Sequence, residues 1–145
     1  MFQEYYEEDI EYLIIKEAVK TNNKETKLIS LEYIKESINR RNKNIQGIYE
    51  VLKFLVFEGT VTPISVDNMV NDFPEVRLEA VKILVQFNNI ETRKVVIEIL
   101  KYENHPLILQ ETIKNLIAKW PDFYGNDDEV AIVINAIEKI SKSNR

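Results

Sequence analysis

The stretch PEVRLEAVKILV, residues Pro74–Val85, returns 32 residues later as PLILQETIKNLI, residues Pro106–Ile117. The proline, a glutamate, a lysine and a leucine keep their places in the second copy, and three further positions exchange only valine for isoleucine. Recurrence at a period of roughly 20 to 50 residues is typical of helical units that stack and bury their apolar faces against one another. The repeated stretch therefore predicts a stack of helices.

The remainder of the 145-residue chain also has the residue spacing of α-helices. It contains only three glycines and four prolines, and its apolar residues recur three and four positions apart. Proline is favoured at the first helical position, so Pro74 and Pro106 each predict a helix start. Further helices are expected at about residues 7–20, 22–41 with Asn22 as cap, 44–58, 90–103 and 126 to the carboxyl end. We therefore predict an all-α protein with seven to eight helices.

The segment Gly59–Phe73 is too long for a simple link between two helices. We expect one short helix within it, at Ser65–Asn71. The preceding helix, residues 44–58, is apolar over about 200° of its surface and so needs cover on more than one side. The prediction is that the segment folds over this helix, with Val61, Ile64, Val66 and Met69 facing inward.

The helix that begins at Pro74 resembles the second helix of a HEAT repeat. In that family an acidic residue precedes the helix, and a proline, a valine, an arginine that reaches back to the turn and a closely packed alanine follow. The residues that carry the resemblance are Asp72, Pro74, Val76, Arg77, Ala80 and Leu84. The resemblance implies a short α-solenoid built from stacked helical hairpins.

Two weaker copies extend this pattern along the chain. The copy at Pro106 replaces the arginine by Leu109 and the alanine by Thr112. An upstream copy, Glu25–Ile34, lacks the proline and has Lys27 at the arginine position.

Pairing each copy with the helix before it gives the expected architecture. It consists of about three HEAT-like helical hairpins plus a C-terminal helix, in a single domain that covers residues 1–145. A plain helical bundle is the structural alternative, since amphipathic helices joined by short links also form bundles.

The sequence contains few groups suited to catalysis or metal binding. There is no cysteine, and no HExxH motif, Gly-rich phosphate loop or GxSxG elbow occurs. The one histidine, His105, precedes a predicted helix start, where a structural role is the simpler interpretation. We expect no catalytic, cofactor or metal site, and no enzymatic activity.

The charge clusters have a structural interpretation as well. Acidic residues gather at residues 4–11 and 122–129, both at predicted helix starts, where the helix dipole favours negative charge. Neither cluster has the ligand spacing of a calcium loop. The small basic cluster of Arg40, Arg41 and Lys43 lies at a predicted helix end, where cations are favoured.

The overall charge favours a protein partner. With 19 Lys and Arg against 24 Asp and Glu, the formal net charge is −5, which disfavours general nucleic-acid binding. We expect a non-enzymatic protein–protein interaction module, a HEAT-like scaffold or adaptor that neutralises or regulates a basic protein such as a toxin. The alternative is a DNA-binding or DNA-repair glycosylase-like HEAT protein. The lone tryptophan, Trp120, is expected to close the core instead of serving such a site.

In a HEAT-like stack the second helices line one continuous face, and the repeat alignment predicts which of their residues are exposed there. That face is mixed in charge and acidic toward the amino end. The predicted partner-binding residues are Glu32, Glu75, Glu79, Lys82, Leu107, Glu111 and Lys114.

The C-terminal helix is a second candidate surface. Its apolar stripe is expected to pack on the preceding helix, whereas Ile132 points away from the stripe. An exposed isoleucine on a terminal helix predicts weak self-association. The stripe consists of Val130, Val133, Ile134, Ile137 and Ile140.

Composition also gives an expectation about location and source. The acidic amino terminus lacks the basic and apolar regions of a signal peptide, and no apolar run approaches the roughly 18 residues of a membrane span. We therefore expect a cytoplasmic protein with no membrane contact. The excess of 20 isoleucines over five arginines is typical of an AT-rich, bacterial genome.

Overall fold

The computed structural model describes residues 2–40, 44–58, 60 and 73–143. These residues form seven α-helices and one 3₁₀ helix, with no strand among them, so the predicted all-α class is confirmed. The short helix expected at Ser65–Asn71, and the inward-facing residues expected around it, lie outside the described residues. The elements are α1 (Phe2–Ala18), α2 (Lys24–Asn39), α3 (Ile45–Phe57), α4 (Pro74–Leu84), α5 (Ile90–Tyr102), α6 (Pro106–Lys119), η1 (Pro121–Gly125) and α7 (Asp127–Ser143).

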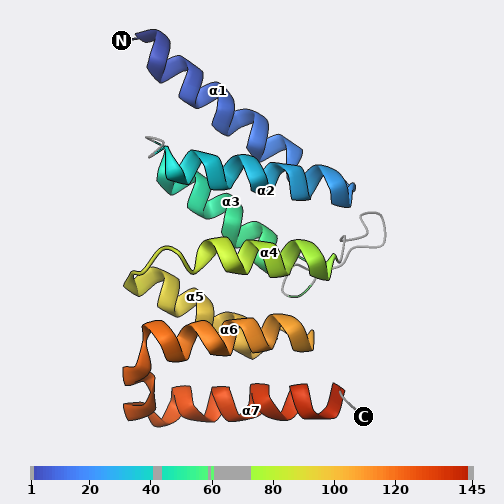
Figure 1. Ribbon diagram of the computed structural model, residues 1–145, viewed down its shortest axis with the longest axis vertical. Coiled ribbons are helices and arrows are strands. Elements are labelled where there is room, and N and C mark those ends of the chain that lie inside the picture. The colour runs from blue at the N-terminus through green and yellow to red at the C-terminus, as the bar shows by residue number, and fades with distance from the viewer. Residues whose placement is uncertain (1, 41–43, 59, 61–72, 144–145) are drawn as a thin grey trace.

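The helices form two layers, and within each layer they succeed one another along the long axis of the molecule (Figure 1). One layer contains α1, α3, α5 and α7, and the other contains α2, α4 and α6. Neighbours within each layer are in contact, and each of α2, α4 and α6 also packs on the helix that precedes it in the chain. Figure 1 shows that α2, α4 and α6 run in the same direction, opposite to α3, α5 and α7. The described chain is thus a series of stacked helical hairpins followed by α7.

Side-chain caps fix where the helices begin. The side-chain oxygens of Asn23, Asn89 and Asn126 accept hydrogen bonds from backbone N–H groups in the first turns of α2, α5 and α7. The prediction of Asn22 as the cap of α2 is wrong by one residue. His105 caps α6, because its Nδ1 accepts a hydrogen bond from the Leu107 N–H at 3.3 Å.

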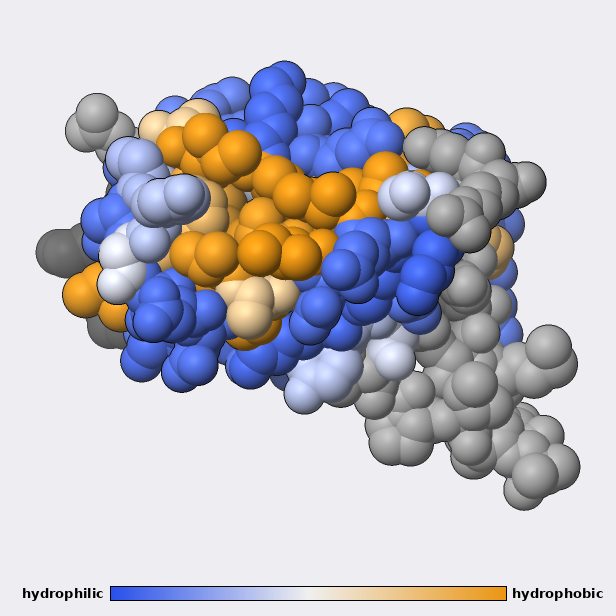
Figure 2. Space-filling view, turned by 90° about the horizontal axis from the view of Figure 1, so that it is seen from below, coloured by the Kyte–Doolittle hydropathy of each residue, from blue (hydrophilic) through white to orange (hydrophobic). Residues whose placement is uncertain are grey.

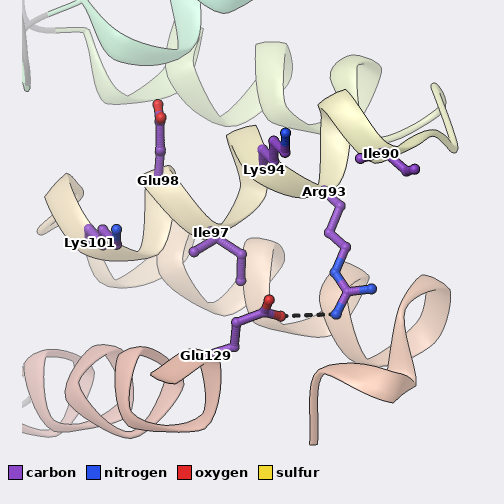
Figure 3. Close-up of a pocket in the computed structure, with 7 residues that line it drawn as sticks. All are labelled: Ile90, Arg93, Lys94, Ile97, Glu98, Lys101 and Glu129. Atoms are coloured by element: carbon purple, nitrogen blue, oxygen red, sulfur yellow. Dashed lines mark hydrogen bonds and ion pairs between the residues drawn. The ribbon is translucent and has the colours of Figure 1, made fainter. Parts of the chain in front are cut away.

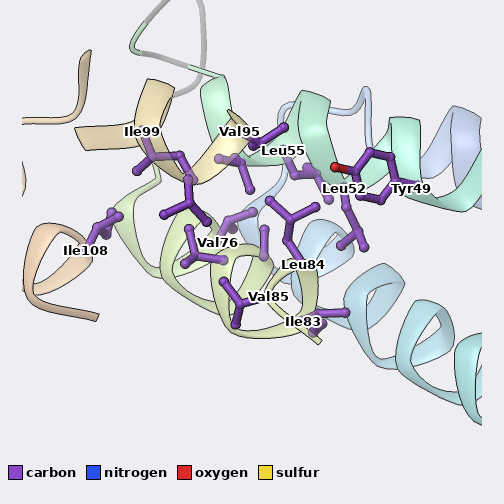
Figure 4. Close-up of a cluster of buried hydrophobic side chains, with 14 of the residues drawn as sticks. Tyr49, Leu52, Leu55, Val76, Ile83, Leu84, Val85, Val95, Ile99 and Ile108 are labelled. Atoms are coloured by element: carbon purple, nitrogen blue, oxygen red, sulfur yellow. The ribbon is translucent and has the colours of Figure 1, made fainter. Parts of the chain in front are cut away.

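The core is continuous between the two layers (Figure 4). Leu52 and Leu55 of α3 are fully buried, and so is Leu84 of α4. The Tyr49 ring meets Phe87 edge-on at 5.3 Å between centroids, and its hydroxyl lies 3.2 Å from the Thr92 hydroxyl. Burial raises the pKa of Tyr49 above its usual value, because the ionised phenolate would be poorly solvated in this core.

Two buried cations connect successive hairpins. Lys27 of α2 forms an ion pair with Glu58, the residue that ends α3, and donates a hydrogen bond to the Val19 carbonyl at 2.9 Å. Arg77 of α4 forms the equivalent pair with Glu103, the residue that ends α5. In both cases the ion pair joins the second helix of one hairpin to the residue that ends the first helix of the next hairpin.

The Arg77–Glu103 pair has two hydrogen bonds and is almost completely buried. Arg77 Nε lies 2.8 Å from Glu103 Oε1, and Arg77 Nη2 lies 3.2 Å from Oε2. The same Oε2 accepts the N–H groups of Asn104 and His105, each at 3.0 Å, so the carboxylate also orders the turn into α6. The HEAT resemblance implied that Arg77 reaches back to the turn at Asp72, which lies outside the described residues.

The copy of the repeat that begins at Pro106 has an apolar residue at the position of Arg77. Leu109 of α6 corresponds to Arg77 and is fully buried. If α5 and α7 are aligned on their capping residues Asn89 and Asn126, Glu103 corresponds to Ile140, which is partly buried against the core. The cation and the carboxylate have therefore been replaced together by apolar residues.

Removing one member of the Arg77–Glu103 pair is expected to destabilise the protein strongly. Arg77→Leu leaves a buried carboxylate without its cation and should lower the free energy of unfolding by about 3–5 kcal/mol in chemical denaturation. The double variant Arg77→Leu/Glu103→Ile, which copies the residue types of Leu109 and Ile140, should lose about 1–3 kcal/mol less than the sum of the single variants.

The control is the exposed pair between Lys82 and Glu79, whose nitrogen and oxygen are 3.5 Å apart. Glu79→Gln should change the free energy of unfolding by less than about 1 kcal/mol. Strict additivity of the two core substitutions would contradict a coupled buried pair.

Candidate functional site

The predicted partner-binding residues lie on three helices of one layer. Glu32 lies on α2, Glu75, Glu79 and Lys82 lie on α4, and the other three lie on α6. Because α4 contacts both α2 and α6, these residues occupy one side of the stack. Glu79 and Glu111 are partly exposed and the remaining five are exposed. We call the surface formed by these seven residues and by the exposed or partly exposed side chains beside them the second-helix face; Ile117, at the edge of α6 next to α7, is not part of it.

Lysines neutralise part of the acidic charge on the second-helix face. Lys24 Nζ lies 3.1 Å from Glu75 Oε1, which joins α2 to α4 across 51 residues of sequence. Glu79 pairs with Lys82 on the same helix. Glu32 pairs in the same way with Lys35 at 3.7 Å. The face is therefore more balanced in charge than a count of its glutamates suggests.

The prediction missed Lys24 and Lys35 as members of this face. The spacing of Glu32 and Lys35, three residues apart on a helix, is a pattern that could have identified one of them. The contact between Lys24 and Glu75 depends on how two hairpins pack, which no local spacing reports.

Exposed apolar side chains accompany these charges. Ile29 of α2 and Leu107 of α6 are both more than half exposed. A mixture of apolar and charged side chains is what the surfaces of transient protein complexes contain.

A shallow depression of about 500 Å³ lies on the opposite side of the stack, over α5 and the start of α7 (Figure 3). The Arg93 guanidinium lies in this depression and donates to Asp122 at 2.8 Å and to Glu129 at 3.0 Å. These hydrogen bonds raise the pKa of Arg93 above its usual value and attach η1 and α7 to α5. The residues that line the depression are Ile90, Arg93, Lys94, Ile97, Glu98, Lys101 and Glu129.

The carboxyl-terminal acidic cluster is thus divided between two roles. Asp122 and Glu129 bind Arg93, and Asp127 and Asp128 are exposed in the first turn of α7. In the described part of the chain no three His, Cys, Asp or Glu side chains are grouped so as to hold a metal ion. Of the predicted basic cluster, Arg40 pairs with Glu11 at 2.6 Å, and Arg41 and Lys43 lie outside the described residues.

A second depression, of about 430 Å³, lies between α1 and α2. It is almost entirely apolar and is lined by Ile10, Glu11, Ile14, Ile15 and Tyr33. The sequence prediction did not identify it, because it depends on the angle between α1 and α2.

The prediction for α7 is wrong about which isoleucine is exposed. Ile132 is partly buried and packs against the core, whereas Ile134 and Ile137 are each 51% exposed. The reason is that α7 packs on both α5 and α6, so its buried side is centred on Val133 and Ala136. Trp120 is buried at the end of α6, as expected of a core residue.

No protein-family model matches this chain, and neither a curated protein nor a solved structure matches it. Among the described residues, no helix has both the length and the apolar character needed to cross a membrane.

The ion pair between Arg93 and Asp122 predicts how the Asp122 carboxyl titrates. The hydrogen bond from Arg93 lowers the pKa of the Asp122 carboxyl below its usual range. A depressed carboxyl pKa stabilises the fold above the ordinary value of about 3.9, and this stabilisation is lost as the pH falls through the lower folded value. Arg93→Gln should therefore shift the titration midpoint of Asp122, measured by NMR, upward toward about 3.9. Lys94→Gln on the same helix is the matched control and should leave the midpoint in place.

Proposed function

We propose that this protein is a non-enzymatic, HEAT-like helical-repeat module that binds another protein through the second-helix face. The observation that carries the proposal is the alignment of α2, α4 and α6 in one layer, with buried residues on one side and exposed charged and apolar residues on the other. Parallel helices at regular spacing form an extended surface, which is how helical-repeat proteins bind partners.

A basic protein is the partner that this surface fits best. The chain carries a formal net charge of −5, and α2 has three exposed glutamates, Glu25, Glu32 and Glu36. The acidic α2 end of the face would accelerate the association of a basic partner by electrostatic steering. Capture of a toxin or regulation of an enzyme through its basic surface is the role that follows from this chemistry.

The alternative is a DNA-binding or DNA-repair glycosylase-like protein with the same stacked helices. Such a protein needs clustered Lys and Arg to bind phosphates. On the second-helix face, Lys24, Lys35 and Lys82 each already pair with a glutamate. The described surface therefore favours the protein partner.

The proposal predicts that charge reversal on the second-helix face weakens partner binding. A partner first has to be identified by affinity purification and mass spectrometry, and its association rate then measured at several salt concentrations. The triple variant Glu32→Lys/Glu79→Lys/Glu111→Lys should associate about tenfold or more slowly at low salt, with a weaker salt dependence.

The matched control reverses three exposed glutamates on the other layer, Glu17, Glu91 and Glu98. It changes the net charge by the same amount but should retain most of the association rate. Equal effects of the two triple variants would sink the proposed face. Tight binding of duplex DNA that weakens steeply with salt would support the alternative.

A further inference from the structure

The open end of the stack carries an apolar surface. Ile134 and Ile137 of α7 are each 51% exposed, and Ile117 of the adjacent helix α6 is 54% exposed. Figure 2, which views the molecule from the α7 end, shows a contiguous hydrophobic area bordered by polar residues. A contiguous apolar area rimmed by polar residues is typical of an interaction surface.

The corresponding positions one repeat earlier, on α5 and at the end of α4, are buried. The repeat aligns Ile117 with Val85, and the capping residues Asn89 and Asn126 align Ile137 with Leu100. Val85 is only 3% exposed and Leu100 only 1% exposed. These positions lie where α6 packs on α4 and on α5. Among the described residues, no helix lies beyond α6 and α7 to cover them in the same way. The exposed isoleucines thus occupy positions that a further helix would cover.

We propose that α7 of a second copy of this chain covers this surface, in an antiparallel and symmetric dimer. The row of residues that would form the contact contains Val130, Ile134, Ile137 and Ser141, whose spacings of four, three and four place them on one side of a helix. This contact row is symmetric about its midpoint. An antiparallel second copy therefore places Ile134 against Ile137 of the other chain, and Val130 opposite Ser141.

The charges at the two ends of α7 select the same orientation. Asp127 and Asp128 are exposed in its first turn, and Lys142 is exposed in its last turn. Antiparallel pairing brings each acidic end next to the basic end of the other helix and also opposes the helix dipoles. A parallel pair would place like charges together. Glu138 is exposed, and its position on α7 places it at the edge of the proposed contact.

This dimer goes beyond the proposed function and is compatible with it. The contact uses α7 and the adjacent edge of α6, at one end of the stack (Figure 1). It leaves the charged residues of α2 and α4 exposed. Each dimer would therefore present two second-helix faces.

Sedimentation equilibrium of the 145-residue chain tests the proposal. Wild type should have twice the 17.1 kDa monomer mass at about 100 μM, and Ile137→Glu should raise the dimer dissociation constant at least tenfold. Because Ile137 is half exposed, the helicity of the Ile137→Glu variant, measured by circular dichroism, should equal that of the wild type. Leu13→Glu, at the equally exposed Leu13 of α1, is the matched control and should still dimerise.

A monomeric wild type at about 500 μM would overturn the proposal. Assemblies larger than a dimer that Leu13→Glu abolishes would also overturn it, because they indicate stacking of the α7 end on the α1 end of the next copy.

Disulfide cross-linking tests the orientation, since the chain contains no cysteine. A mixture of Ser141→Cys and Val130→Cys proteins should form a cross-linked dimer containing one of each. Ser141→Cys alone should not cross-link, because in the antiparallel pair the two copies of that residue are about 16 Å apart, beyond the reach of a disulfide. Efficient cross-linking of Ser141→Cys alone would indicate a parallel pair and contradict the proposed geometry.

Discussion

The structure depends on the buried ion pair between Arg77 and Glu103. A buried charge is tolerated only with a well-placed partner, so α4 has to lie where its guanidinium meets the end of α5. The carboxylate accepts the N–H groups of Asn104 and His105 as well, which sets the direction of the chain into α6. The backbone carbonyl of Glu103 accepts a hydrogen bond from Lys139 of α7 at 3.1 Å. One residue thereby positions parts of four helices.

A second buried ion pair, with a lysine in place of the arginine, connects the first two hairpins of the stack. Lys27 is fully buried, pairs with Glu58 and lies 5.7 Å from the centre of the Phe54 ring. It also satisfies a carbonyl at the end of α1, as Lys119 does for Val85 at the end of α4. These polar contacts are specific in direction, unlike apolar burial. We infer that they fix the register of hairpins whose apolar surfaces alone would allow several packings.

The sequence predicted the parts of this fold that depend on local chemistry. Pro74 and Pro106 begin helices as expected, and Asn126 caps the last one, because proline and asparagine act within a few residues of their own position. The pairing of Arg77 with Glu103 was not predictable in the same way. The two residues are 26 positions apart and meet because α4 and α5 both pack on α3 and on α6. The positions of the buried cations were nevertheless visible in the repeat alignment, which placed Lys27 under Arg77.

The candidate surfaces show the same division. Of the seven residues that the alignment placed on the face, five are exposed and two, Glu79 and Glu111, are partly exposed, since exposure follows the helical period. It could not assign Lys24 as the partner of Glu75, or the exposed side of α7, because these depend on neighbouring helices. For α7 the sequence contained the apolar stripe but not the fact that two helices, α5 and α6, pack on it. That contact buries Ile132 and exposes Ile134 and Ile137.

The most direct measurement of the central pair is proton exchange at the Arg77 side chain, followed by NMR in the wild-type protein near pH 7. Because its Nε–H donates to a buried carboxylate, it should exchange at least about tenfold more slowly than that of Arg40, whose side chain is 61% exposed. It should also show nuclear Overhauser contacts to the Glu103 side chain. Rapid exchange like that of Arg40, with no contact to Glu103, would contradict the account.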